Sequence, residues 1–201
     1  MDEERAAAET REWLTPYLLR FRQAGSRVLD IGCGHGFESA LLCDDGFRVT
    51  AFDRDAPSIR AAHERAPGAL HFGADLSRPL PLATSVFDGA VASLSLHYLR
   101  HAETRAAVSE VHRVLRDGGL FLFRVNATDD FKFGAGDGEE VEPGVYLQKT
   151  AAGATRLKRF FDEHAVRDTL AGLFVIEELS HRTTYRWGPA KQTWQCLARA
   201  A

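Results

Sequence analysis

A glycine-rich turn preceded by an acidic residue is the stretch of this chain whose residue types most clearly suggest chemistry. Residues 28–38, VLDIGCGHGFE, are an apolar run that breaks into glycines at alternate positions, Gly32, Gly34 and Gly36. Glycines lack the side chains that would hold a ligand away from the backbone. Asp30 stands two residues before the first glycine. Because a carboxylate repels phosphate, this acid favours a ligand that carries positive charge over a pyrophosphate.

Two further acidic residues follow apolar runs in the same way. Asp53 follows the run 48–52, and Asp75 follows the run 70–74. In an open parallel sheet, ligands bind beyond the carboxyl ends of the strands. A single Asp there is also a common helix cap or turn residue. Three acids at successive strand ends, with a glycine turn after the first, are a stronger signal and predict one shared binding site.

The elements that must position these residues alternate along the chain. Strands are expected over 27–31, 48–52, 70–74, 87–93 and 120–125, and helices over 36–43, 56–66 and 104–115. Such alternation gives parallel strands joined by crossover helices in a three-layer α/β sandwich. A helix over 162–171 and two strand-like runs, 174–179 and 192–198, close the pattern with an antiparallel pair. We therefore expect a mostly parallel seven-stranded sheet with an antiparallel C-terminal strand.

The length of the chain fits one domain, residues 1–201, with one substantial core. Residues 1–25 are expected to form an N-terminal helical cap that changes direction at Thr15-Pro16. Residues 126–158 interrupt the alternation with many glycines and a cluster of acids. This composition predicts a long irregular segment, and we expect residues 126–160 to act as a lid or substrate loop.

Composition argues against several classes of partner. The net charge is −3, and no basic stripe is evident, which disfavours nucleic acid and anionic membranes. The acidic N-terminus lacks the apolar core of a signal peptide, and no apolar run is long enough to span a bilayer. The 3 cysteines are scattered, so neither a disulfide framework nor a zinc site is indicated. We expect a cytoplasmic protein without nucleic-acid or membrane partners.

These motifs resemble those of the class I S-adenosylmethionine-dependent methyltransferases, in particular the type 11 and type 25 groups. The matching pieces are VLDIGCGHG, AFDRD, GADLS, FDGAVASLSLHYL and EVHRVLRDGGLFLF, which lie between about residues 28 and 125. The resemblance implies a Rossmann-like fold, S-adenosyl-L-methionine as cofactor and methyl transfer as the activity. Asp117 stands where the family often has proline, which affects only a turn.

The resemblance also implies a role for each matching residue. Asp30 would interact, directly or through water, with the cationic amino end of the cofactor's methionine part, and Ser93 would offer its carbonyl to the same amine. Asp53 would accept hydrogen bonds from both ribose hydroxyls. Arg54 would cover one adenine face, unless it is simply solvated. The other implied cofactor residues are Gly32, Cys33, Gly34 and Gly36 along the turn, and Asp75 or the backbone of Leu76 at the adenine edge.

Residues beyond the later strands are candidates for the acceptor side. His97 could deprotonate a hydroxyl or thiol because imidazole titrates near neutrality, or it could be a satisfied surface histidine. His97 and His101 are four residues apart, but no third ligand is in view, so no metal is expected. The C-terminal half resembles small tellurite-resistance-type methyltransferases with a comparable His-Arg-Thr. That likeness implies that His181 and Arg182 steer an anionic or polarised substrate; the alternative is a polar hairpin turn.

We therefore expect methyl transfer to a small-molecule acceptor held in line with the methyl group. An NAD-dependent oxidoreductase is a weaker alternative, since its fingerprint needs two residues between the second and third glycines. This chain has one, His35. A second alternative is a noncatalytic adenosylmethionine-binding protein, such as a regulatory subunit. It would keep the glycine turn without an acceptor pocket.

Overall fold

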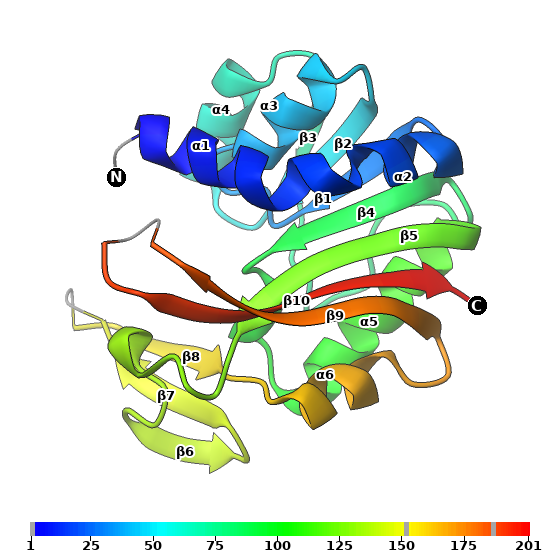
Figure 1. Ribbon diagram of the computed structural model, residues 1–201. Helices are drawn as coiled ribbons and strands as arrows, with labels where there is room; N and C mark the ends of the chain where they lie inside the picture. The colour runs from blue at the N-terminus through cyan, green and yellow to red at the C-terminus, as the bar shows by residue number, and fades with distance from the viewer. Residues whose placement is uncertain (1–2, 151–152, 186–187) are drawn as a thin grey trace.

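Figure 1 shows a seven-stranded sheet with helices on both faces in the computed structural model, which describes residues 3–150, 153–185 and 188–201. The strand order is β3-β2-β1-β4-β5-β10-β9. Among the described strands of this sheet, β10 alone runs in the opposite direction to the others, and it pairs antiparallel with β5 and β9. The expected mostly parallel seven-stranded sheet with an antiparallel C-terminal strand is confirmed.

The strands of this sheet are β1 (Arg27–Ile31), β2 (Arg48–Asp53), β3 (Leu70–Gly73), β4 (Phe87–Ser93), β5 (Leu115–Asn126), β9 (Phe174–Thr184) and β10 (Lys191–Ala200). β5 begins before the expected residue 120 and β9 extends beyond the expected residue 179, while the other strands lie close to the expected ranges. The α-helices are α1 (Glu3–Leu14), α2 (Leu18–Ala24), α3 (Phe37–Asp44), α4 (Ala56–Arg65), α5 (His101–Val114) and α6 (Glu163–Leu170). Short 3₁₀ turns are η1 (Thr15–Tyr17), η2 (Leu96–Tyr98) and η3 (Phe131–Phe133).

Apolar cores lie on both faces of the sheet because side chains alternate along its buried strands. On β1, Val28 belongs to the core that Trp13 and Phe21 share with helices α1 to α4. Leu29 and Ile31 belong to the core that is shared with α5 and α6. The sheet is thus the middle layer of three. Within the expected cap 1–25, α1 and α2 are joined by the 3₁₀ turn η1 at the Thr15-Pro16 pair, and the flanking Leu14 and Leu18 keep helical backbone angles.

The prediction of a long irregular segment over 126–158 is wrong. This region contains a second, antiparallel sheet made of β6 (Glu139–Glu142), β7 (Val145–Lys149) and β8 (Thr155–Arg159), which Figure 1 shows beside the main sheet. Gly138 and Gly144 adopt positive φ and flank the first short strand. Strands this short, bounded by glycines and half exposed, carry too little periodicity to be recognised. Two expected segments, 1–25 and 126–160, include residues 1–2 and 151–152, which lie outside the described ones.

The position expected for the His181-Arg182-Thr183 motif is also corrected. These residues lie inside β9 rather than in a turn after it, and Trp194 and Thr193 of β10 pair with His181 and Arg182. The strand is longer than its apolar run because its second half is exposed and polar. Since β9 is antiparallel to β10, and β10 is antiparallel to β5, β9 ends at the same sheet edge as β5.

Candidate functional site

A cavity of about 680 Å³ lies at the carboxyl ends of the parallel strands. Its wall includes the glycine turn after β1, the start of α3, and the residues that follow β2, β3 and β4. The small sheet contributes Arg156 of β8 to the same wall. Of the cofactor residues expected from the sequence, the cavity brings together Gly32, Cys33, Gly34, Asp53, Arg54, Asp75, Leu76 and Ser93. Asp30 and Gly36 do not line it.

The three glycines of the turn serve different purposes. Gly34 has a φ of +51°, and a Cβ built on it would meet no atom within 4 Å, so its backbone faces open space at the cavity. A Cβ on Gly36 would lie 2.8 Å from the Cα of Ala62 in α4, and one on Gly32 would lie 2.5 Å from the Cβ of Ser95. The sequence reasoning assigned all three glycines to the ligand. Close packing against neighbouring residues is sufficient to explain why Gly32 and Gly36 are glycines.

Asp53 is tied to the glycine turn by its carboxylate. Its Oδ2 accepts a hydrogen bond from the Gly34 amide at 3.0 Å, and its Oδ1 accepts one from the Asp55 amide at 3.0 Å. These contacts fix the direction in which the carboxylate points. Each carboxylate oxygen has a second acceptor position, so the group can still receive two hydrogen bonds from a ligand in the cavity.

Asp75 lines the cavity just after the end of β3. Its Oδ1 accepts hydrogen bonds from the amide and hydroxyl of Ser77 at 2.9 Å and 2.8 Å, and these bonds lower the pKa of the carboxyl group. Asp75 is therefore ionised at neutral pH. Leu76 and the exposed Arg54 lie on the same wall, so an apolar surface and a cation accompany the carboxylate.

Asp30 lies beneath the turn rather than on the cavity wall. It is 1% exposed, and the Ser39 hydroxyl donates to its Oδ2 at 2.5 Å. Burial first, and then the charge of Glu38, raise the pKa of Asp30 to about 8. Asp30 is consequently mostly protonated at pH 7 in the protein alone. A cation brought close to it would favour the ionised form.

A buried ionic network lies beside Ser93 and was not expected from the sequence. Arg124 of β5 is 3% exposed, forms an ion pair with Glu9 of α1, and donates from Nε to the Ser93 hydroxyl at 2.9 Å. Glu38, which lines the cavity, lies 3.6 Å from Arg124. The Trp13 indole donates to the same Glu38 at 3.2 Å. The N-terminal helix is thereby connected to the cavity wall.

His97 is a buried residue, so the alternative of a satisfied surface histidine is wrong. It lies in η2, is 3% exposed, and its ring centre is 4.1 Å from that of Tyr98. Within the described residues, its Nδ1 has no hydrogen-bond partner. Burial lowers the pKa of His97 well below its usual value, and the charges of Lys191 and Lys158 add to this effect. The ring is neutral at pH 7, next to wall residue Tyr98 but not itself on the wall.

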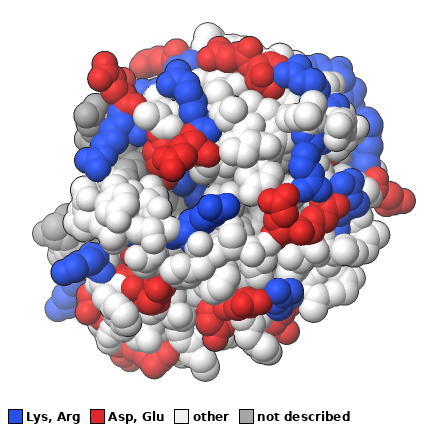
Figure 2. All heavy atoms as spheres, viewed as in Figure 1, with Lys and Arg blue, Asp and Glu red and all other residues white. Residues whose placement is uncertain are grey.

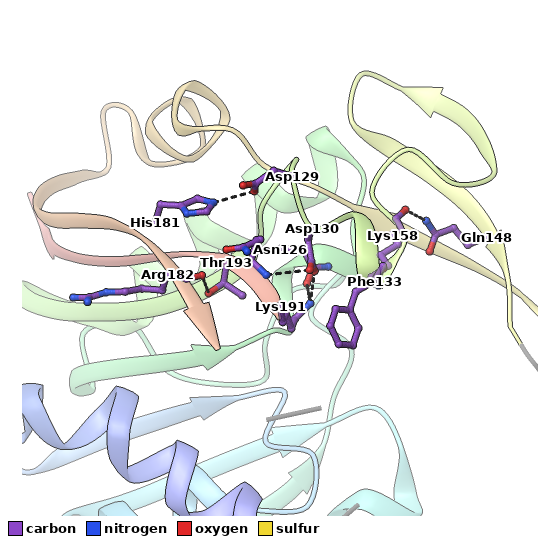
Figure 3. Close-up of polar contacts among 12 residues, drawn as sticks. Asn126, Asp129, Asp130, Phe133, Gln148, Lys158, His181, Arg182, Lys191 and Thr193 are labelled. Carbon is purple, nitrogen blue, oxygen red and sulfur yellow. Dashed lines mark hydrogen bonds and ion pairs between the residues drawn. The ribbon is translucent and has the colours of Figure 1, made fainter. Parts of the chain in front are cut away.

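His181 and Arg182 are both exposed residues of β9 and do not line the cavity. Figure 3 shows the His181 ring directed toward Asp129, at an Nε2 to Oδ1 distance of 2.9 Å, while Arg182 points away along the strand. The same view shows a buried cluster in which the Lys191 ammonium contacts Asn126 at 2.7 Å and Asp130 at 2.6 Å. These contacts connect the start of β10 to residues 126–130, which precede the small sheet.

The sequence analysis did not assign several residues of the wall to the site. They are Phe37, Glu38, Leu94, Ser95 and Leu99, which lie in the quoted motifs, and Arg156, which lies outside them. Leu94 has a φ of 56°, which is uncommon for a residue other than glycine and often marks a functional turn. Arg156 comes from the segment expected to be irregular, so only the pairing of β8 with β7 reveals its place.

The described residues contain no group of three or more His, Cys, Asp and Glu side chains arranged to hold a metal ion. They also contain no helix that is long and apolar enough to cross a membrane.

Comparison with known proteins gives consistent matches. Residues 29–123 match the family model of a methyltransferase domain. A malonyl-acyl-carrier-protein O-methyltransferase of Laribacter hongkongensis is 32% identical over 164 residues, covering 74% of this chain and 50% of the relative. The chain spans about half the length of the curated relatives that it matches.

Solved structures share the fold over nearly the whole chain. A methyltransferase from Methanosarcina mazei superposes with a TM-score of 0.78 at 24% identity, covering 92% of this chain and 97% of that one. The 1,6-didemethyltoxoflavin-N1-methyltransferase of Burkholderia thailandensis, which holds 1,6-didemethyltoxoflavin and S-adenosylhomocysteine, has a TM-score of 0.66 at 22% identity. It covers 100% of this chain and 91% of that one.

The strand order and the glycine turn after β1 define a Rossmann-like domain that binds a nucleotide-type cofactor at its carboxyl edge. The matched methyltransferase domain and the S-adenosylmethionine-dependent methyltransferases among the relatives and solved structures support the class I methyltransferase family, with S-adenosyl-L-methionine as the cofactor. This assignment takes the place of the NAD-dependent alternative.

Proposed function

We propose that this protein transfers the methyl group of S-adenosyl-L-methionine to a small-molecule acceptor by in-line displacement. The observation that carries the proposal is the single cavity in which Gly34, Asp53 and Asp75 lie on the same wall as Tyr98 and Arg156. The part of this wall that carries Gly34, Asp53 and Asp75 suits the cofactor. The other part, after β4 and on β8, leaves room for an acceptor. A noncatalytic adenosylmethionine-binding subunit would not need that second part.

The residues present fit the cofactor. The open backbone at Gly34 gives the ligand close access to the turn, and the two free acceptor positions of Asp53 suit a pair of ribose hydroxyls. Asp75 and Leu76 supply a charged and an apolar surface to the adenine edge. Ser93 and the buried Asp30 are assigned to the amino end, where a cation would favour ionised Asp30. Arg54 is assigned to an adenine face.

Bound S-adenosyl-L-methionine would supply an electrophilic methyl group on a sulfonium. The task of the protein is then to align an acceptor atom with that methyl. We assign His97 as the general base for an acceptor that arrives protonated, because its ring is neutral and its Nδ1 has no partner within the described residues. His181 and Arg182, outside the wall, are assigned to steering an anionic or polarised acceptor toward the cavity. We assign segment 126–160, which carries Arg156, to the acceptor wall.

A small molecule is favoured over nucleic acid by the charge distribution. On the face shown in Figure 2, basic and acidic side chains are interspersed, and the net charge of the chain is −3. Nucleic-acid binding relies on many phosphate contacts from clustered cations. The name of the Burkholderia relative likewise describes methylation of a small molecule.

Calorimetry with S-adenosylmethionine and with NAD tests the cofactor, and release of S-adenosylhomocysteine tests turnover. Acceptors to screen are thiols, phenols, amines and metalloid oxyanions. We expect binding of adenosylmethionine but not NAD, and turnover with at least one acceptor class. Binding of NAD alone would refute the assignment. Tight binding of adenosylmethionine without turnover on any class would favour the noncatalytic alternative.

A further inference from the structure

The cavity is electrostatically divided. Its wall carries four acidic side chains near the glycine turn and after β2 and β3, namely Glu38, Asp53, Asp55 and Asp75. Two arginines also line it. Arg54 directly follows Asp53 and stands among these acids, whereas Arg156 comes from β8, which packs against η2. One end of the cavity is therefore acidic, and the acceptor end has a cation of its own.

The guanidinium of Arg156 is available for a ligand. It lies over the Tyr98 ring, 5.2 Å from the ring centre, and Tyr98 itself lines the cavity. Across the described ranges 3–150, 153–185 and 188–201, no carboxylate forms an ion pair with it. A guanidinium on an aromatic face keeps its N–H donors free at its edge, in the planar arrangement that matches a carboxylate or phosphate.

Further cations stand behind this wall. Lys158, also on β8, donates to the carbonyl of Phe133, a neutral acceptor, while Lys191 contacts the carboxylate of Asp130 at 2.6 Å (Figure 3). The charges of Lys191, Lys158 and Arg156 all act on His97 in η2. Cationic side chains thus gather at this end of the site, and Asp130 pairs with Lys191 among them.

We propose that the methyl acceptor carries an anionic oxygen group, a carboxylate or phosphate, which Arg156 binds at the η2 end of the cavity. This inference rests on the proposed function, because it concerns the acceptor of the same reaction. Arg156 then selects the acceptor and anchors one end of it. The nucleophilic atom of the acceptor is left to face the cofactor part of the cavity.

Matched pairs of probes test the inference with the protein saturated with S-adenosylhomocysteine. The pairs are acetate and acetamide, benzoate and benzamide, and 4-hydroxybenzoate and 4-hydroxybenzamide, with phenyl phosphate and phenol as the phosphate arm. Affinities are measured by calorimetry or by NMR titration. A charge-assisted, bidentate contact predicts that at least one anion binds roughly tenfold or more tightly than its neutral analogue.

Three variants locate the effect. Arg156→Gln should abolish the preference for the anion, and Arg156→Lys should retain part of it, since the charge remains without the planar fork. Lys149→Ala is the matched control, because Lys149 is an exposed cation of the same small sheet that does not line the cavity. It should keep the preference of the wild type. The affinity for S-adenosylhomocysteine, measured in each variant, reports that the cofactor site is intact.

Two results would overturn the inference: wild-type protein that prefers no anion in any pair, or a preference that survives Arg156→Gln. Either can occur while S-adenosylhomocysteine binds normally, and the proposed function then stands without this acceptor class. Failure of the wild-type protein to bind S-adenosylhomocysteine would instead remove the proposed function itself.

Discussion

Arg124 of β5 and Glu9 of α1 form a buried ion pair in which Nη2 and Oε2 are 3.2 Å apart and Nη1 also contacts Oε1. The two residues are far apart in the sequence, yet the pair connects the N-terminal helix to the strand end beside Ser93. Removing one partner of such a pair leaves a buried charge without its counterion.

Glu9→Ala should therefore lower the free energy of unfolding by about 3 kcal/mol, since breaking a buried pair costs more than breaking an exposed one. Glu38, 3.6 Å from Arg124, remains and limits the loss. The matched control is Arg22→Ala, which removes the more exposed Arg22–Asp45 pair and should cost less than about 1 kcal/mol. Urea unfolding measures both; equal losses would contradict the role of the buried pair.

Asp53→Ala should weaken binding of S-adenosylmethionine by about 1.5–3 kcal/mol, the scale of lost hydrogen bonds to a charged group. This corresponds to roughly a tenfold to hundredfold rise in Kd by calorimetry. Asp117→Ala is the control, because Asp117 is an exposed acid that does not line the cavity. Unchanged affinity in Asp53→Ala would show that the ribose assignment is wrong.

Alanine substitutions at two glycines of the turn should have different effects, one mainly on stability and the other mainly on cofactor binding. Gly36→Ala places a methyl 2.8 Å from the Ala62 backbone and should destabilise the fold by about 3 kcal/mol, from overpacking together with left-handed strain. Gly34→Ala has room and should cost only about 1 kcal/mol of strain. Its methyl enters the cavity, so cofactor affinity should fall instead. Denaturation and calorimetry on both variants separate these effects, and similar stability losses would disprove the distinction.

His97 should make the protein less stable in mild acid. Burial holds its folded-state pKa well below the usual value, whereas the unfolded chain titrates near about 6.5. As the pH falls below that value, the unfolded state binds more protons, and the free energy of unfolding decreases by at most about 1.4 kcal/mol per pH unit from this group. His97→Gln should have a shallower decline between pH 7 and pH 5. Parallel curves would exclude a buried neutral imidazole.

Asp30, in contrast to His97, should make the protein less stable as the pH rises. The pKa of Asp30 is raised to about 8 in the folded state, above the unfolded value of about 3.9. The stability that comes from the proton bound in the folded state is therefore lost as the pH rises from about 3.9 to about 8. Asp30→Asn, which resembles the protonated form, should gain stability relative to the wild type between pH 5 and pH 8. Urea unfolding across this range measures the difference. A difference that is independent of pH would show that Asp30 is ionised throughout.

Local sequence was sufficient to predict that residues at successive strand ends share one cavity. Apolar runs that end in Asp53 and Asp75 mark strand ends, and alternation with helices makes the strands parallel. Parallel strands bring their carboxyl ends to one edge, so residues at successive strand ends meet without further information. The structure accordingly brings both acids to one cavity with Gly34.

The sequence by itself therefore determined the alternation of strands and helices, the resemblance to a methyltransferase family and the placement of two acids, because these depend on periodicity and on spacing within short segments. Only the tertiary structure decided that Gly34 alone of the three glycines faces open space, that His97 is buried, and that Arg156 reaches the cavity from a second sheet. Each of these depends on contacts between distant segments. Burial and charge at a residue are set by such neighbours, which no local pattern records.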